Sequence, residues 1–315
     1  MTETVSARDG ETPALSPLAA GQPLLQARTP HGSTLPATVA FVGAGRAAGA
    51  LAVAVSAAGH PVVAIASRDP RRAADLAGRV AARPVASALS AVRAADLTFL
   101  TVPDGAVASV AAAVAASGTI LRGRGVVHCS AGLGVDALAA LRLTGAAVGS
   151  LHPLQALTGA ESAPLLRGAL MAVDADPTLL APLRALAVEL GGRPVELPAG
   201  ARTLYHAAAV LTGSAPLVLL EAATELMVDA GLDRGTAEQG LLTLMEGAVV
   251  NARRLGPRQA LTGPVVRGDS ATVAAHLAAL ADHPDADQLY RAITRAALHL
   301  TSPMPPVTPE DMPCP

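Results

Sequence analysis

Between residues 37 and 198, short apolar runs rich in β-branched residues alternate with longer stretches of helical periodicity. The runs predict strands at 38–42, 62–67, 97–102, 125–128, 148–151, 169–173 and 194–197. The stretches between them predict helices that include 46–58, 70–80, 105–116 and 177–190. Continuous apolar strands separated by helices are typical of a doubly wound, mainly parallel sheet that is covered on both faces.

The strand pattern stops after Pro198. The remaining periodic stretches predict helices at 199–230, 233–255, 270–281 and 284–300. A second, all-α domain is therefore expected at 199–300, after an α/β domain at 37–198, with the ligand bound between them. The segments 1–36 and 301–315 are rich in Pro, Gly, Ser and Thr without periodicity, and we predict that both are disordered tails.

The composition argues against several classes of partner. Aromatic residues make up 1% of the chain and the net charge is −2, so neither base stacking nor a basic surface favours nucleic acid. Apolar runs are shorter than a membrane span and the first residues lack the pattern of a secretory signal, so no membrane is predicted. Cys129 and Cys314 do not suggest a disulfide framework, which favours the cytoplasm.

The basic residues limit the possible chemistry. All 23 residues counted as Lys or Arg are arginines, so lysine-dependent mechanisms are excluded. No group of His, Cys, Asp and Glu has the spacing of metal ligands, so no metal is expected.

A glycine-rich loop joins the first predicted strand to the first predicted helix. Its sequence runs Gly43-Ala-Gly45-Arg46-Ala-Ala48-Gly49. Gly43 would allow a tight turn, Gly45 would let a pyrophosphate approach the backbone, and Ala48 or Gly49 would let the helix pack closely on the strand. The free N–H groups of the helix then attract phosphate, so the loop predicts a dinucleotide site. Arg46 is either a further phosphate ligand or a solvated residue.

The end of the second predicted strand selects the dinucleotide. An NAD site carries Asp or Glu there for the ribose hydroxyls, whereas this chain has Ser67 and Arg68. A hydroxyl and a guanidinium are suited to a 2′-phosphate, so NADP(H) is favoured over NAD(H). Asp69 is expected to cap the following helix, and Arg71 or Arg72 could reinforce the phosphate contact.

Two further strand ends are expected to meet the cofactor. Val102 and Pro103 follow the strand at 97–102, and the nicotinamide ribose would lie over this end. Pro103 and Asp104 also form a turn and a helix start. His128 and Ser130 follow the next strand and are further candidates at the same crevice.

The order of these motifs resembles the Rossmann-like proteins with a C-terminal domain of the DUF2520 type, relatives of pyrroline-5-carboxylate reductase and ketopantoate reductase. The resemblance spans about residues 38–300. The matching segments are the glycine loop, Ser67-Arg68, TVPD at 101–104, HCSAG at 128–132, HPLQ at 152–155, YHAAA at 205–209 and ALTGPVVRGD at 260–269.

This resemblance implies reduction of a small 2-oxo acid or imine by NADPH. Reduction of 2-dehydropantoate to pantoate is the leading expectation, and pyrroline-carboxylate-type imine reduction is the alternative. The resemblance also implies a C-terminal domain similar to that of 6-phosphogluconate dehydrogenase and a homodimer formed through the helical domain.

The chain departs from the family at Ser214, where relatives usually carry Asn, so a substrate-binding role there passes to a hydroxyl or is lost. A non-catalytic NADP-binding sensor or assembly protein remains a second hypothesis, because fold alone does not determine function.

Histidines are the candidate proton donors in a chain without lysine. His152 follows a strand and has Gln155 close by, a candidate to bind substrate, and His206 starts a helix after the domain junction. Each of the two histidines could instead make a structural contact. A neutral donor could replace them, with Asn251 and Ser130 as candidates.

The loop at 260–269 carries the candidate carboxylate clamp. Arg267 offers a guanidinium to a substrate carboxylate, with Thr262 nearby in the same loop. Asp269 either orients Arg267 or caps the next helix.

Overall fold

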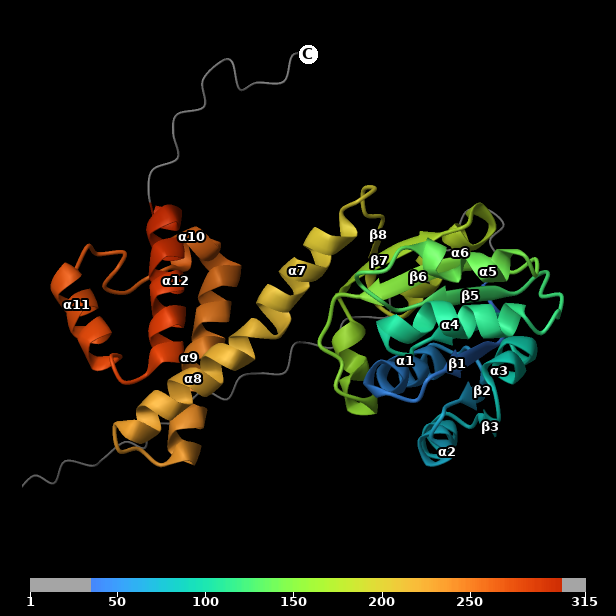
Figure 1. Ribbon diagram of the computed structural model, residues 1–315, viewed down its shortest axis with the longest axis horizontal. Coiled ribbons are helices and arrows are strands. Elements are labelled where there is room, and N and C mark those ends of the chain that lie inside the picture. The colour runs from blue at the N-terminus through green and yellow to red at the C-terminus, as the bar shows by residue number, and fades with distance from the viewer. Residues whose placement is uncertain (1–34, 302–315) are drawn as a thin grey trace, which may run out of the picture. The chain divides into compact units, whose positions relative to one another are not determined.

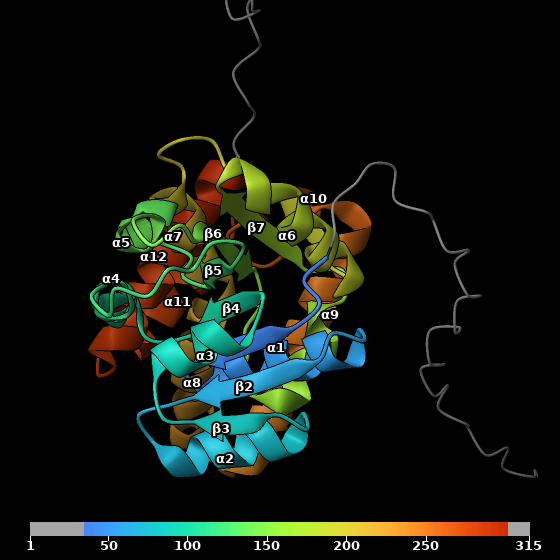
Figure 2. The same ribbon diagram turned by 90° about the vertical axis from the view of Figure 1, so that its right-hand side faces the viewer.

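The computed structural model describes residues 35–301, and the predicted tails at 1–34 and 302–315 lie outside the described residues. The first part of the described chain is an α/β domain built on an 8-stranded sheet (Figure 1). Its strands are β1 (Val39–Val42), β2 (Val62–Ala66), β3 (Arg83–Val85), β4 (Leu97–Leu100), β5 (Gly125–His128), β6 (Ala147–Pro153), β7 (Leu170–Ala175) and β8 (Arg193–Val195). The spatial order is β3-β2-β1-β4-β5-β6-β7-β8, and Figure 2 shows the β3 edge of the sheet.

The sheet confirms the predicted mainly parallel fold, with one departure. Strands β3 to β6 pair in parallel, and β8 is parallel to β7, but β6 and β7 are antiparallel. Strand β6 also runs farther than the predicted 148–151, so His152 lies inside the strand, opposite Ala172 of β7, and does not follow it. Strand β3 was not predicted, because its Arg-Pro-Val sequence at the sheet edge has no apolar pattern.

Helices cover both faces of the sheet because strand residues alternate between two cores. On one face Val39 and Phe41 pack with residues of α1 (Arg46–Ala57), α2 (Pro70–Arg79) and α6 (Pro177–Glu189). Phe41 stacks on Phe99 with ring centroids 5.2 Å apart. The other face, with Ala40 and Val42, is covered by α3 (Ala88–Ala94), α4 (Asp104–Ala115), the 3-10 helix η1 (Val135–Leu138) and α5 (Ala139–Arg142).

The rest of the described chain is helical, as predicted. Its helices are α7 (Arg202–Gly213), α8 (Ala215–Asp229), α9 (Arg234–Leu255), α10 (Pro257–Ala260), α11 (Ser270–Ala279) and α12 (Pro284–Thr301). The predicted helix at 199–230 divides at Ser214, just before Pro216. Asp233 caps α9 through the Thr236 N–H, and helix α9 packs along α8.

Few residues of the long C-terminal helices are buried. Helix α7 has none, α8 has Thr224 and α9 has Ala237. Large apolar side chains on these helices are instead exposed, including Leu204, Leu211, Leu217, Leu244 and Val250. The C-terminal helices therefore carry much apolar surface that nothing in the described chain covers.

Candidate cofactor and substrate site

The glycine loop forms the tight turn that its sequence predicts. Gly43 has φ +110°, and a Cβ at this position would lie 2.6 Å from the Thr101 carbonyl oxygen. At Gly45, the N-cap of α1, a Cβ would meet nothing within 4 Å, and no side chain caps the helix. The first N–H groups of α1 therefore stay open to a ligand beside the loop.

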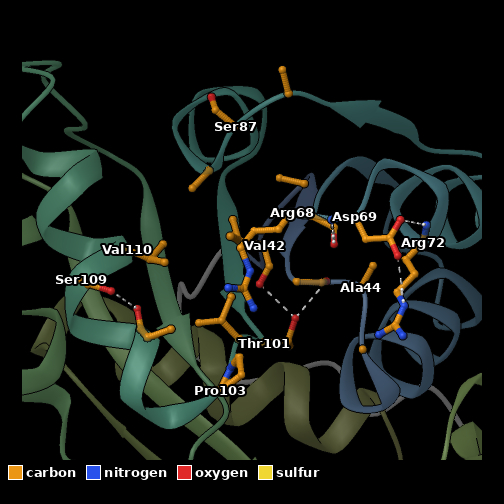
Figure 3. A pocket seen from close by; sticks show the side chains of 18 residues that line it. Val42, Ala44, Arg68, Asp69, Arg72, Ser87, Thr101, Pro103, Ser109 and Val110 are labelled. Atoms are coloured by element: carbon orange, nitrogen blue, oxygen red, sulfur yellow. Dashed lines mark hydrogen bonds and ion pairs between the residues drawn. The ribbon is translucent and has the colours of Figure 1, made fainter.

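A pocket of about 730 Å³ opens beside this loop, across the carboxyl ends of β1, β2 and β4. It brings together six of the predicted cofactor residues. These are Gly43, Gly45, Ser67, Arg68, Val102 and Pro103. In Figure 3 the Arg68 side chain extends into the pocket, whereas Arg72 is turned toward Asp69, to which its Nε lies at 3.4 Å. Asp69 caps α2 by accepting from Arg71 N–H, as predicted.

This pocket fits a phosphorylated dinucleotide by its own chemistry. Its volume lies within the range of small-molecule sites, and its lining combines apolar strand ends with hydroxyls, the guanidiniums of Arg68 and Arg72, and the Asp69 carboxylate, which caps α2 and pairs with Arg72. No carboxylate takes the place of Ser67 at the end of β2. Ser67 and Arg68 would hold a 2′-phosphate, and the open start of α1 would hold the pyrophosphate.

Sequence reasoning missed several residues of this pocket. Thr101 donates from Oγ1 to the carbonyl oxygens of Val42 and Gly43, both at 3.2 Å, so it holds the glycine turn. Its position one residue before Val102 at the strand end was the available signal. Ser87 and Ser109 also line the pocket. Ser87 could not be found from the sequence, because it follows strand β3, which was not predicted.

Arg46, Ala48 and Ser130, the other predicted cofactor residues, lie outside this pocket, as does Gly49, the alternative to Ala48. Arg46 lines a neighbouring hollow with Arg72 and Arg79. Ala48 is fully buried in the core, where its small size lets α1 lie against the sheet. A Cβ on Gly49 would lie 3.0 Å from the Ala160 nitrogen of the 3-10 helix η2 (Ala160–Leu166).

Ser130 belongs to a buried polar network after β5. Its Oγ donates to Asp104 Oδ2 at 2.6 Å, and its N–H donates to His128 Nδ1 at 3.2 Å. His128 therefore accepts at Nδ1 and donates from Nε2 to the Gly134 carbonyl at 3.1 Å. Burial lowers the pKa of His128, so this histidine is neutral and structural. The network joins the first turn of α4 to the loop after β5.

The neighbouring Cys129 is not a candidate nucleophile. Burial raises the pKa of its thiol to about 12, so the thiol stays protonated. Within residues 35–301, no group of three or more His, Cys, Asp and Glu side chains could hold a metal ion.

A second pocket, of about 410 Å³, brings together four of the predicted catalytic and substrate residues. His152 and Gln155 come from the end of β6 and the loop after it. His206 lies in the second turn of α7, which begins at Arg202 and not at His206 as predicted, and Ser214 is the C-cap of this helix. The His206 ring also approaches the loop after β5, because a Cβ on Gly132 would lie 3.3 Å from its Nδ1.

His152 is neutral in this pocket. Burial, and then the nearby His206 and Arg202, lower its pKa to about 4. Its Nδ1 lies 2.8 Å from the Tyr205 hydroxyl, and the two rings meet edge to face with centroids 5.5 Å apart. At neutral pH this imidazole can form hydrogen bonds, but it is not an imidazolium that could give up a proton.

The start of α7 is tied to the sheet by Arg202. Its Nη2 donates to the buried Ser150 Oγ at 2.6 Å and to Asp174 Oδ2 at 3.2 Å. Ser150 lies two residues before His152 on β6 and on the same face of the sheet. Sequence reasoning missed Arg202 and Tyr205 as site residues, because their partners Ser150, Asp174 and His152 are 28 to 53 residues away in the chain.

The structure does not bring the remaining candidates to the histidine pocket. Asn251 is exposed on α9, and Thr262 and Arg267 are exposed in the loop before α11. Asp269 caps α11 by accepting from the Thr272 N–H at 3.0 Å, the capping role that was one of its two alternatives.

Comparisons with known proteins agree with this architecture. Residues 38–132 match the family described as NADP oxidoreductase coenzyme F420-dependent, and residues 169–297 match the domain of unknown function DUF2520. The first match lies in the part of the sheet that carries the glycine loop, and the second covers the last strands and the helices that follow. The predicted resemblance and the predicted cofactor class are thereby confirmed. The DUF2520 match begins at the last strands of the sheet, before α7. Among curated proteins, none matches the chain in sequence.

Solved structures share the fold over most of the chain. A proposed NADP oxidoreductase from Bacteroides fragilis is 24% identical, with a TM-score of 0.70 over 84% of this chain and 98% of that one. A reductive aminase from Aspergillus terreus, in complex with NADPH and ethyl-5-oxohexanoate, is 18% identical with a TM-score of 0.60 over 84% and 94%. A 1-pyrroline-5-carboxylate reductase from Streptococcus pyogenes is 15% identical with a TM-score of 0.54 over 83% and 98%.

Proposed function

We propose that this protein is an NADPH-dependent reductase of small imines, and that the substrate binds in the pocket of His152 and His206. The observation that carries the proposal is the pairing of a pocket suited to NADP with a histidine pocket next to it. The loop after β5 contacts residues of both pockets. Ser130 binds Asp104, which follows Pro103 of the first pocket, and Gly132 lies close to His206 of the second.

The cofactor bound in the first pocket would supply a hydride. Reduction of a C=N or C=O bond adds this hydride to carbon and a proton to nitrogen or oxygen, so the chain must hold the second atom and admit the proton. His206 is exposed and lines the pocket, so solvent reaches its ring. His152, neutral and fixed by Tyr205, would hold the second atom by a hydrogen bond.

The charge of the pocket favours an imine over the 2-oxo acid that was the leading expectation. The lining residues of the histidine pocket include neither an arginine nor a lysine. A 2-oxo acid carries a carboxylate that needs a cationic partner, whereas a simple imine carries none and is suited to a site without cations. The reductive aminase and pyrroline-5-carboxylate reductase with this fold also support the imine class.

The test is the oxidation of NADPH in the presence of a panel of substrates. The panel contains 1-pyrroline, 1-pyrroline-2-carboxylate and 1-pyrroline-5-carboxylate as imines, with 2-dehydropantoate and pyruvate as oxo acids. Turnover of imines, with NADPH preferred to NADH, is the expected result. Turnover of 2-dehydropantoate alone would indicate that the protein reduces this compound to pantoate. Tight NADPH binding without turnover of any compound would favour the sensor hypothesis.

We also propose that two copies of the chain associate through the exposed apolar surface of the C-terminal helices. The segment Arg202–Asp229 is long and apolar enough to cross a membrane: an 18-residue window within it has a mean hydropathy of 1.5, and 6% of that window is buried. Arg202 and Tyr205 at its start are nevertheless bound to polar groups of the sheet domain, which no membrane span could retain. A second copy is therefore the occupant that this surface favours.

Light scattering on the purified protein tests this association. Leu217, 61% exposed on α8, is expected to give a monomer when replaced by Glu. Leu143, 88% exposed after α5 in the sheet domain, provides the matched control, and Leu143→Glu should leave the dimer intact. A wild-type monomer that binds lipid vesicles would contradict the proposal.

A further inference from the structure

The two tyrosines of this chain both contact a histidine with the same geometry. The Tyr205 hydroxyl lies 2.8 Å from His152 Nδ1, and the Tyr290 hydroxyl lies 2.7 Å from His276 Nδ1. The ring centroids are 5.5 and 5.6 Å apart, with interplanar angles of 85° and 84°. The environments differ, since His276 is exposed on α11 whereas His152 is largely buried and lines the substrate pocket. The second pair therefore serves as an internal control for the first.

His152 can present only one ring nitrogen to the pocket. Its Nδ1 is occupied by Tyr205, and its Nε2 makes no hydrogen bond to any residue in the described part of the chain. Three side-chain atoms in residues 35–301 are buried without a hydrogen-bond partner, and His152 Nε2 is not one of them. Nε2 is therefore open to solvent or to a ligand. The protonation of Nε2 decides whether the pocket meets a hydrogen-bond donor or an acceptor.

We propose that Tyr205 is a positioning residue for His152: its hydroxyl donates to Nδ1 and holds the imidazole in the tautomer that presents Nε2–H to the substrate pocket. This inference rests on the proposed function for its catalytic meaning. The tautomer itself is a property of the protein without substrate.

The direction of the hydrogen bond follows from the protonation states. Burial raises the pKa of the Tyr205 hydroxyl, so it keeps its proton and can donate. Burial and positive neighbours keep His152 neutral, so one of its nitrogens carries a lone pair, which is a better acceptor than a phenol oxygen. The titratable groups that act on His152 are His206, Arg202, Asp104 and His128.

Tyr205 is itself held in place by the turn before it. Helix α7 buries none of its residues, so its position on the sheet depends on polar contacts at its start. Arg202, three residues before Tyr205, is bound to Ser150 and Asp174, which face each other across β6 and β7. This anchor places the Tyr205 hydroxyl over His152, two residues beyond Ser150.

The consequence is a neutral donor at the reacting group. An Nε2–H that is already oriented would bind the lone pair of an imine nitrogen or a carbonyl oxygen and strengthen this hydrogen bond as negative charge develops. The acceptor tautomer would instead repel the same lone pair. Tyr205 would thus affect the rate without contacting the substrate.

Nitrogen NMR of histidine-labelled protein tests the inference directly. Two-bond proton–nitrogen correlations distinguish Nε2–H from Nδ1–H, and His152→Gln assigns the resonances. The wild type with and without NADPH should show His152 protonated at Nε2, with Nδ1 shifted by its hydrogen bond. In Tyr205→Phe the Nδ1 resonance should move to its free position, whereas Tyr290→Phe should move only that of His276.

The same variants separate this inference from the proposed function. With an imine that is turned over, Tyr205→Phe should lower kcat about tenfold and leave NADPH affinity unchanged, and Tyr290→Phe should have wild-type kinetics. A wild type protonated at Nδ1, or a Tyr205→Phe spectrum identical to that of the wild type, would overturn the inference even if imines are reduced. The expected spectra without turnover of any substrate would refute the reductase proposal and leave the tautomer assignment standing. The wild-type spectrum decides the tautomer even if Tyr205→Phe fails to fold.

Discussion

Replacing His152 with Gln should make the protein less sensitive to acid. The pKa of His152 falls from the ordinary 6.5 to about 4 because the ring is buried beside His206 and Arg202. Between these two pH values the unfolded chain binds a proton that the folded chain does not bind. Stability from this residue is therefore fully present above pH 6.5 and is lost as the pH falls toward 4.

The size of the effect follows from the same shift. Each pKa unit corresponds to about 1.4 kcal/mol, so His152 should remove about 3 kcal/mol of unfolding free energy between pH 7 and pH 4. The Gln variant loses this pH dependence but also changes the Tyr205 contact, which gives an offset independent of pH. The pKa of the buried His128 is lowered too, and this contribution cancels in the comparison because both proteins keep it.

Urea unfolding at several pH values measures the difference. The chain has no Trp and two Tyr, so a Tyr290→Phe background leaves Tyr205 as the fluorescent reporter beside the site, with circular dichroism as a second probe. The stability of the Gln variant relative to its parent should rise by about 3 kcal/mol from pH 7 to pH 4. A relative stability that stays constant within about 0.5 kcal/mol would show that His152 is not desolvated and would refute this reasoning.

Three further substitutions test the two pockets. Gly43→Ala should lower the melting temperature and weaken NADPH binding, because its Cβ would lie 2.6 Å from the Thr101 carbonyl oxygen at φ +110°; an unchanged melting temperature would contradict the turn. Arg68→Ala should weaken NADPH binding about 10- to 150-fold in calorimetry, whereas the control Arg71→Ala, outside the pocket, should not; equal affinities would remove Arg68 from the phosphate site. Arg267→Ala should leave both KM for a carboxylated substrate and NADPH affinity unchanged, because Arg267 is exposed in the loop before α11 and does not line the histidine pocket; a strongly raised KM would restore the clamp.

The cofactor side of this protein was predictable from local sequence. A strand, a glycine turn and a helix are adjacent in the chain, so Gly43, Gly45 and the residues that follow specify the dinucleotide loop by themselves. Ser67 and Arg68 follow the next strand directly, and all parallel strands end at the same edge of the sheet. Apolar periodicity also predicted the long helices of the C-terminal part.

The substrate side required the tertiary structure. The sequence alone determined that histidines are the available acids in a chain without lysine, and it suggested His152 and His206. It could not show that β7 reverses direction beside β6, that Arg202 reaches Ser150 and Asp174, or that Tyr205 binds His152. The side-chain contacts join residues 28 to 53 positions apart, and they depend on strand pairing and helix docking. The pKa of His152 depends on them as well, since burial and neighbouring charge exist only in the folded chain.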